Sequence, residues 1–279
     1  MSEYTESGVV FGRGDDRLVG VVAQPEVQSD IGVLILVGGP QYRVGSHRQF
    51  TQLARSLAEA GIASFRFDFA GMGDSEGVRQ EFNHTLEDVC AAIDAFTRQV
   101  PSVSRVVLWG LCDAASSAMI YAPQHPLVSG LVLLNPWVHS GEYAPEVKLT
   151  HFYKPFLSNA SRWRNFVARK DMILPSLKEL GRDMLTLITG GSSPDAQPFV
   201  REMLVGLRAF SHDVLIILSG ADLTASEFSA LISTDTDWRD VSASPSITIH
   251  TLASADHTFS RGSWKSEVNA LTISWLKEI

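Results

Sequence analysis

Cys112 stands in the segment WGLCDAA, between the apolar run RVVLW and a segment with helical periodicity. A nucleophile held in a tight strand-to-helix turn needs small residues two positions away on either side, because the turn strains its backbone. Gly110 and Ala114 meet this need, although the usual pattern is GxSxG. A thiol is more acidic than a hydroxyl, and a helix N-terminus or a paired histidine favours the thiolate further. We predict that Cys112 is a nucleophile; the alternative is a buried structural cysteine.

A nucleophile in such a turn is followed along the chain by an acid and then by a histidine base. His257 comes shortly after the apolar run SITIHTL, and Asp222 comes shortly after DVLIILS. Each therefore stands where the carboxyl end of a strand is expected. We predict that His257 is the base and Asp222 the acid that orients it, with Glu227 as the main rival for the acid.

Acyl transfer passes through an oxyanion, which needs two backbone N–H donors worth roughly 2.7 to 4 kcal/mol each. One donor is expected from Asp113, the residue after the nucleophile. The other is expected from the glycine-rich loop GGPQYRVGSHR, where Pro40 has no N–H to give. Gly39 is the first choice for this donor and Gln41 the second. The alternative is that the loop only reverses the chain; it lacks the GxxxxGK[ST] pattern of a phosphate-binding loop.

Three other residues near these motifs carry weaker predictions. Arg43 in the same loop could recognise an anionic acyl or sugar group, although a solvated surface position is the alternative. Trp137 could form a wall of the pocket. Asp68 is expected to accept backbone N–H bonds and so fix the turn GMGDSEG. No second set of ligands accompanies the histidines, so neither a metal nor another cofactor is expected.

The elements that must position these residues alternate between strand and helix from about residue 31 onward. This order is typical of an α/β protein with a mostly parallel, doubly wound sheet. Before it, SGVVFG and RLVGVVA flank the polar turn RGDD and predict an antiparallel N-terminal hairpin at the edge of the sheet. Helices are predicted over 47–60, from near 85, after the nucleophile, over 227–232 and over 264–279.

Residues 138–210 interrupt this alternation. They hold no clear core strand, many aromatic residues and the interruption GGSSPDAQP. An insertion after the carboxyl end of a strand lies over the crevice where open α/β sheets bind ligands. We therefore predict a helical cap over 138–210, inserted into an α/β core formed by 1–137 and 211–279.

The composition narrows the class of protein and its partners. Of the 279 residues, 45% are apolar and 19% charged, which excludes disorder, collagen, coiled coil and a disulfide-rich miniprotein. Lys and Arg number 23 against 31 Asp and Glu, a net charge of −8. With no basic run, nucleic acid and anionic membranes are poor partners, and a small-molecule acyl substrate is favoured.

The apolar runs and the two cysteines bear on where the protein works. The longest apolar run, IGVLILVGG, is far short of the roughly 20 residues that span a bilayer. The opening residues lack the pattern of a secretory signal, so we expect no membrane span and a cytoplasmic location. Cys90 and Cys112 are expected to be free thiols, with Cys90 shielded on a helix face that packs on the sheet.

Together these motifs resemble the α/β-hydrolase superfamily across almost the whole chain. One branch of it, the hydrolase 1 family associated with exosortase A systems, is resembled by VGGPQYRVGSHRQF, RFDFAGMGDSEG, LWGLCDAAS, LVLLNPW, LSGADLTASEF and ADHTFSR. That resemblance implies a bacterial protein encoded near machinery for exopolysaccharide synthesis and for sorting proteins with a PEP-type C-terminal signal. The chain departs from common members in Cys112 and in Val37 or Gly38, where a histidine often stands. A cysteine nucleophile also resembles dienelactone hydrolases, but the other motifs do not support their substrate.

These observations predict a hydrolase of the esterase or thioesterase kind. It would act on an ester, thioester or lactone through a Cys-His-Asp triad and a covalent acyl-enzyme. An acyltransferase with the same triad differs only in the last step. A protein that binds acyl groups or lipids without catalysis is the alternative from another class.

Overall fold

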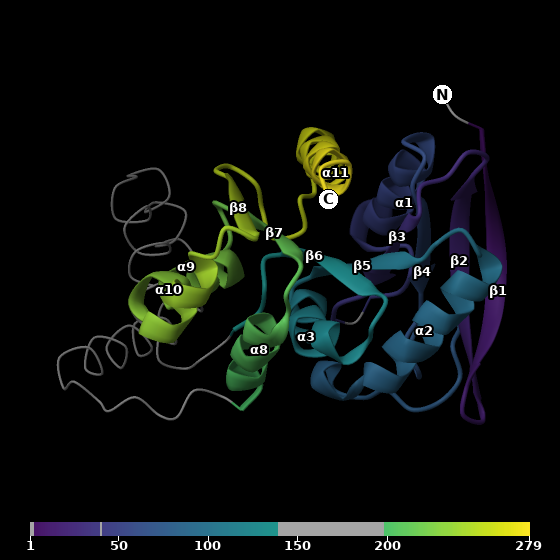
Figure 1. Ribbon diagram of the computed structural model, residues 1–279, viewed down its shortest axis with the longest axis horizontal. Helices are drawn as coiled ribbons and strands as arrows, with labels where there is room; N and C mark the ends of the chain where they lie inside the picture. The colour runs from purple at the N-terminus through teal and green to yellow at the C-terminus, as the bar shows by residue number, and fades with distance from the viewer. Residues whose placement is uncertain (1–2, 40, 139–197) are drawn as a thin grey trace, which may run out of the picture.

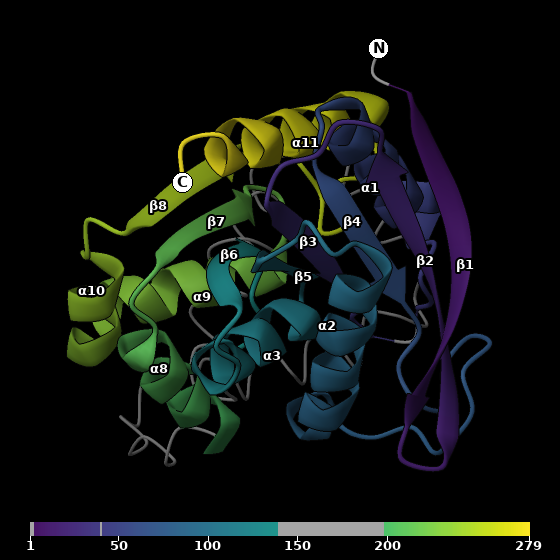
Figure 2. The ribbon, with the colours of Figure 1, turned by 45° about the vertical axis from the view of Figure 1, so that its right-hand side comes forward.

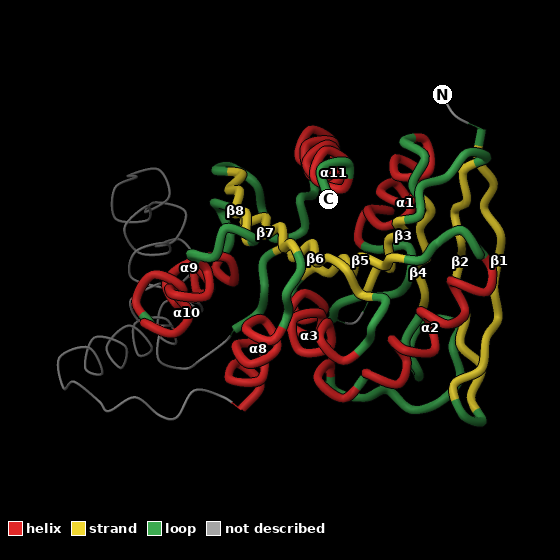
Figure 3. Tube along the Cα trace, viewed as in Figure 1, coloured by secondary structure: helices red, strands yellow, loops and turns green. Residues whose placement is uncertain are grey.

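The computed structural model describes residues 3–39, 41–138 and 198–279, in which eight strands form one sheet (Figure 3). The strands are β1 (Tyr4–Arg13), β2 (Asp16–Pro25), β3 (Ile31–Leu36), β4 (Ala63–Phe67), β5 (Arg105–Leu111), β6 (Val128–Leu134), β7 (Asp213–Ser219) and β8 (Ile247–Leu252). The α-helices are α1 (Gln49–Glu59), α2 (Leu86–Gln99), α3 (Asp113–Tyr121), α8 (Pro198–Ala209), α9 (Leu223–Thr234), α10 (Thr236–Ser242) and α11 (Gly262–Leu276). Short 3-10 helices cover Ser46–Arg48, Phe82–His84 and Ala122–Gln124.

The strand order is β1-β2-β4-β3-β5-β6-β7-β8. Strand β2 pairs antiparallel with β1 and with β4, and every pair from β4 to β8 is parallel. The mostly parallel α/β sheet and the antiparallel N-terminal hairpin are thus confirmed. Because the parallel strands all point the same way, the loops that follow them meet at one edge of the sheet.

Helices cover both faces of the sheet. Helices α1 and α11 lie on one face, and α2, α3 and α8 lie on the other (Figures 1 and 2). The central strands β3 and β4 are buried at every position, as expected for strands between two helix layers. The ring of Phe50 on α1 meets Trp109 on β5 edge to face, with the ring centres 5.6 Å apart.

The expected helix over 47–60 is α1, and its buried apolar residues follow the predicted spacing. Gly61, just beyond its end, has a φ of 82°, which a residue with a side chain rarely adopts. The expected helix over 227–232 is part of the longer α9, and the closing helix is α11. Local periodicity therefore located these helices, while their ends differ by a few residues.

Most of the predicted cap, residues 139–197, lies outside the described residues. Within the predicted range, α8 packs closely on α3. A Cβ atom added to Gly206 would stand 2.2 Å from the carbonyl oxygen of Met119, so only glycine permits this approach. Helix α8 thus belongs to the layer that covers one face of the sheet, and the extent of the cap stays a prediction.

Candidate active site

Cys112 occupies the turn between β5 and α3 with a strained backbone, φ 64° and ψ −124°. Its N–H donates to the carbonyl of Leu134 at the end of β6, 2.9 Å away. A Cβ atom on Gly110 would stand 2.5 Å from the carbonyl oxygen of Ala114, so the turn needs glycine at that position. The half-buried thiol therefore stands at the carboxyl edge of the sheet, in the geometry of a nucleophile elbow.

His257 lies between a carboxylate and the thiol. Its Nδ1 atom is 2.9 Å from Oδ2 of Asp222, and the same oxygen accepts the N–H of Ala225 and so caps α9. Hydrogen bonds with Asp222 first and Cys112 second raise the pKa of His257 to about 10, although burial opposes this. The structure thus brings the three predicted side chains together. Glu227, the predicted rival, is 3% exposed on α9, whereas Asp222 makes the contact with His257.

Asn135 is a site residue that the sequence analysis missed. Its amide nitrogen donates to the Ser219 hydroxyl (2.8 Å) and to the carbonyl of His257 (2.9 Å). Its amide oxygen accepts the N–H of Ser219 at 2.8 Å, and the Ser219 hydroxyl donates to the carbonyl of Asp256. The fully buried Asn135 thereby ties the ends of β6 and β7 to the loop that carries His257. The available signal was an asparagine directly after the strand LVLL, at the same sheet edge as the triad.

One of the two predicted oxyanion donors, the N–H of Gly39, is bonded to a carboxylate of the protein itself. The N–H of Gly39 donates to both oxygens of Asp113, at 2.8 and 3.0 Å, and the N–H of Ala114 donates to one of them. Burial raises the pKa of Asp113, although hydrogen bonds from the backbone of Gly39, Ala114 and Asp113 oppose this. Gln41, the second choice, folds its side chain back on the loop and accepts the N–H of Ser46 at 2.9 Å.

The guanidinium of Arg43 pairs with two carboxylates, those of the buried Asp68 and of Asp74. Asp68 also accepts the backbone N–H groups of Arg43 (2.6 Å) and Asp74 (3.0 Å). This is the turn-fixing arrangement expected of Asp68. The substrate-binding role of Arg43 stays a prediction, and it would require this arginine to leave carboxylates that already hold it.

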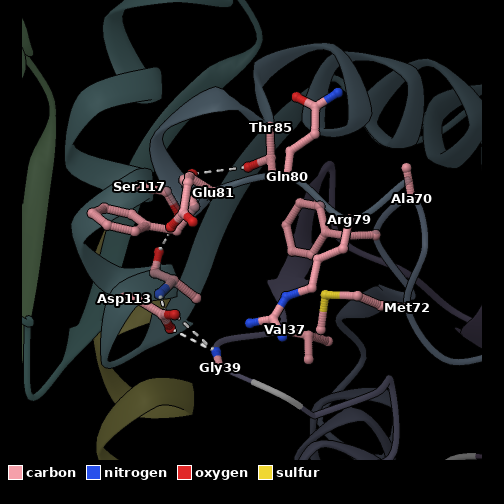
Figure 4. A pocket seen from close by; sticks show the side chains of 13 residues that line it. Val37, Gly39, Ala70, Met72, Arg79, Gln80, Glu81, Thr85, Asp113 and Ser117 are labelled. Atoms are coloured by element: carbon pink, nitrogen blue, oxygen red, sulfur yellow. Dashed lines mark hydrogen bonds between the residues drawn. The ribbon is translucent and has the colours of Figure 1, made fainter. Parts of the chain in front are cut away.

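A cavity of about 340 Å³ borders the elbow at Asp113 and Ala114 (Figure 4). Its lining combines the apolar side chains of Phe69, Met72 and Phe82 with polar ones that include Arg79. Trp137 is not among the lining residues. Its ring stacks on Phe199 of α8 with centres 5.0 Å apart and meets Phe82 edge to face at 5.5 Å. Trp137 therefore packs against Phe82, which lines the cavity, and does not line the cavity itself.

Residues 3–39, 41–138 and 198–279 also bear on metal binding and on membranes. In those ranges, no group of three or more His, Cys, Asp or Glu side chains is arranged to hold a metal ion. None of the described helices combines the length and apolar character needed to cross a membrane.

The sheet order and the elbow at its carboxyl edge define an α/β hydrolase. Residues 32–185, more than half of the chain, match the family described as serine aminopeptidase, S33. The chain belongs to this family. The narrower resemblance to hydrolases of exosortase A systems stays a prediction.

Solved structures share this fold at low sequence identity. An esterase of Pyrococcus furiosus is 15% identical, with 99% of this chain and 93% of that chain covered and a TM-score of 0.65. A dienelactone hydrolase of Anabaena variabilis is 16% identical over 99% and 98%, with a TM-score of 0.62. A proline iminopeptidase of Mycobacterium smegmatis is 15% identical over 98% of each chain, with a TM-score of 0.59. No curated protein matches the sequence.

Replacing Asn135 with alanine should loosen the loop that carries His257. The Ser219 N–H and the His257 carbonyl would lose buried partners, at about 1–3 kcal/mol for each unsatisfied group. We expect the free energy of unfolding to fall by roughly 2–4 kcal/mol and the kcat for an activated ester to fall with it. Asn269→Ala is the matched control, because that amide donates to Ser56 between α1 and α11. Equal effects of the two variants on kcat would contradict a positioning role for Asn135.

The two thiols should differ in reactivity. Cys90 is half-buried rather than shielded, since its place on α2 leaves it partly exposed. Burial first, then the nearby charges of Asp94 and Glu87, raise the pKa of Cys90. Iodoacetamide at pH 7 should therefore modify Cys112 first, as followed by peptide mapping over time. His257→Ala should slow that labelling, because a cationic imidazole stabilises a thiolate.

His250→Ala is the control for the labelling experiment. This histidine is exposed on the edge strand β8, so its removal should leave the labelling of both thiols unchanged. Preferential labelling of Cys90 would contradict the pairing of Cys112 with His257. Equal labelling rates of Cys112 in the wild type and in His257→Ala would also contradict it.

Proposed function

We propose that the protein is an esterase-like hydrolase in which Cys112 is the nucleophile and a covalent acyl-enzyme forms. The observation that carries this proposal is the contact chain from Asp222 through His257 to Cys112, with Cys112 in the strained elbow. The substrate class is an ester, a thioester or a lactone. The resemblance of the chain to exosortase-associated hydrolases extends the proposal to bacterial exopolysaccharide or protein-sorting pathways.

The proposed nucleophile is a thiol in place of the serine for which the family is named, and a cationic His257 would stabilise its charged form. With its pKa raised to about 10, His257 keeps its proton at neutral pH. A hydrogen bond with the side chain of Cys112 is one of the causes of that increase. A thiolate beside an imidazolium is a stable resting pair, and Asp222 stabilises the cation from the other side.

The chemistry then runs in two steps. The Cys112 sulfur attacks the carbonyl carbon, and collapse of the tetrahedral oxyanion breaks the bond to the leaving group, which takes the proton from His257. In the second step, water attacks the resulting thioester while His257 accepts its proton. The acid product leaves, and the thiolate and imidazolium are restored. Transfer to an alcohol would differ only in the group that replaces water.

An activated ester tests this proposal directly. We expect p-nitrophenyl acetate to acylate Cys112 stoichiometrically, with a burst of product and an acyl thioester located by mass spectrometry. Cys112→Ala should abolish the adduct and turnover while the thermal midpoint stays within roughly 5 °C, because this residue is functional rather than core. Cys112→Ser should keep partial activity at most, and Cys90→Ala full activity.

Turnover that persists in Cys112→Ala would remove this residue from the mechanism. A protein that only binds acyl groups would form no adduct at all. Faster release of the acyl group by an added alcohol than by water would make the protein a transferase instead of a hydrolase.

His257 and Asp222 should act as one unit. His257→Ala should lower kcat/KM by roughly 10³-fold or more, and adding Asp222→Asn should cost little further, because cooperating catalytic groups are strongly non-additive. Asparagine still caps a helix, so Asp222→Asn should preserve α9. Glu227→Gln is the control for the choice of acid. Additive losses in the double variant would mean that Asp222 acts elsewhere.

The pH profile gives a second readout of the same pair. In the wild type, the rate of acylation by an alkyl ester should decline as pH rises through about 10, because His257 then loses the proton that the leaving alkoxide needs, whereas p-nitrophenolate leaves without one. Stopped-flow measurements of the acylation rate at a series of pH values would follow this decline. A wild-type acylation rate that keeps rising above that pH would contradict a protonated His257.

A further inference from the structure

The carboxylate of Asp113 lies where the oxyanion of a substrate is expected. Its two oxygens accept the N–H of Gly39, at 2.8 and 3.0 Å, and one also accepts the N–H of Ala114 at 2.9 Å. Gly39 and Asp113 are the two residues whose N–H groups would hold an oxyanion. The carboxylate of Asp113 therefore already accepts the first of these two donors, the N–H of Gly39.

The surrounding backbone fits this carboxylate closely. A Cβ atom on Gly38 would stand 2.4 Å from Oδ1 of Asp113 and equally close to the carbonyl oxygen of Leu111. The loop after β3 can thus approach the elbow only because residue 38 has no side chain. The loop and the carboxylate are therefore in close contact, although Gly39 and Asp113 are 74 positions apart in the sequence.

The cationic side chain of Arg79 lies near this carboxylate. Arg79 lines the same cavity, and in Figure 4 its guanidinium points toward the end where Asp113 and Gly39 lie. Its charge attracts the Asp113 carboxylate. Within the described ranges, Arg79 forms no ion pair with another carboxylate, whereas Arg43 is already bound to two. Arg79 is therefore available to receive the Asp113 side chain inside the cavity.

Resting on the proposed function, we propose that Asp113 determines the acylation rate by occupying the oxyanion hole of the free enzyme. A substrate carbonyl gains the two N–H donors only after the Asp113 side chain rotates away from Gly39. Rotation about the Cα–Cβ bond moves the carboxylate between staggered positions without moving the backbone N–H of Asp113. Arg79 then holds the displaced carboxylate on the cavity side, and the freed hole stabilises the tetrahedral intermediate.

Two reagents that both react with Cys112 distinguish an Asp113 that blocks the oxyanion hole from an Asp113 with another role. Acylation by p-nitrophenyl acetate passes through an oxyanion, whereas alkylation by iodoacetamide displaces iodide at a CH₂ carbon and forms none. In Asp113→Ala, we expect the burst rate of acylation to rise by roughly tenfold or more, because a hole donor changes the rate by 10²–10³-fold. The alkylation rate of Cys112 should stay within about twofold of the wild type, because that reaction does not use the hole.

Arg79→Gln supplies the second arm of the experiment. It should slow acylation in the wild-type background, because the displaced carboxylate loses its partner, and should have no effect in the Asp113→Ala background. Should Asp113→Ala fail to fold, Asp113→Asn decides the question, since a neutral amide binds the N–H groups of Gly39 and Ala114 less strongly than a carboxylate does. Faster acylation than in the wild type supports the proposal in either variant.

Three results would overturn it. Slower acylation with unchanged alkylation would mean that Asp113 holds the Gly39 loop in place rather than blocking it. Equal acylation rates in the wild type and in Asp113→Ala would mean that the carboxylate does not limit the reaction. Alkylation of Cys112 without acylation in any variant would overturn the proposed hydrolase function, and this proposal with it.

Discussion

The backbone of Cys112 is held at a φ of 64°, a conformation that costs about 1–3 kcal/mol when a residue carries a side chain. Neighbouring elements keep it there: its N–H bonds to Leu134, and its carbonyl accepts the N–H of Trp137 at 3.3 Å. The Ser116 hydroxyl donates to the carbonyl of Trp137 and accepts its N–H, so α3 and the chain after β6 are joined directly behind the elbow. The strained turn places the sulfur at the carboxyl edge of the sheet. The other site residues lie around this sulfur.

The parallel sheet brings those residues to one edge, and buried polar contacts fix them there. Asn135 joins the ends of β6 and β7 to the backbone of His257, while Asp222 both caps α9 and holds the imidazole ring. A single carboxylate therefore orients the base and anchors a helix. Loss of either contact would remove one of the hydrogen bonds that hold His257 in position.

Charge is distributed unevenly around the thiol. On one side, Asp222 and Cys112 favour the protonated imidazole of His257. On the other side, the carboxylate of Asp113 is held by backbone N–H groups in a partly buried position, with Arg79 across the cavity. On the proposed function, the first arrangement stabilises the charge on the sulfur, whereas the second keeps the N–H of Gly39 occupied.

The sequence by itself determined the alternation of strands and helices, the N-terminal hairpin, the elbow and the residues that meet around it. These features depend on local periodicity, on glycine and on the rule that parallel strands end at one edge. Only the tertiary structure decided which side chains touch across long separations, such as Asn135 with the His257 loop or Gly39 with Asp113. It also paired Arg43 with Asp68 and left Cys90 half-buried. The physical reason is that hydrogen-bond partners and exposure depend on side-chain direction and on neighbours from distant segments, which residue type and spacing do not encode.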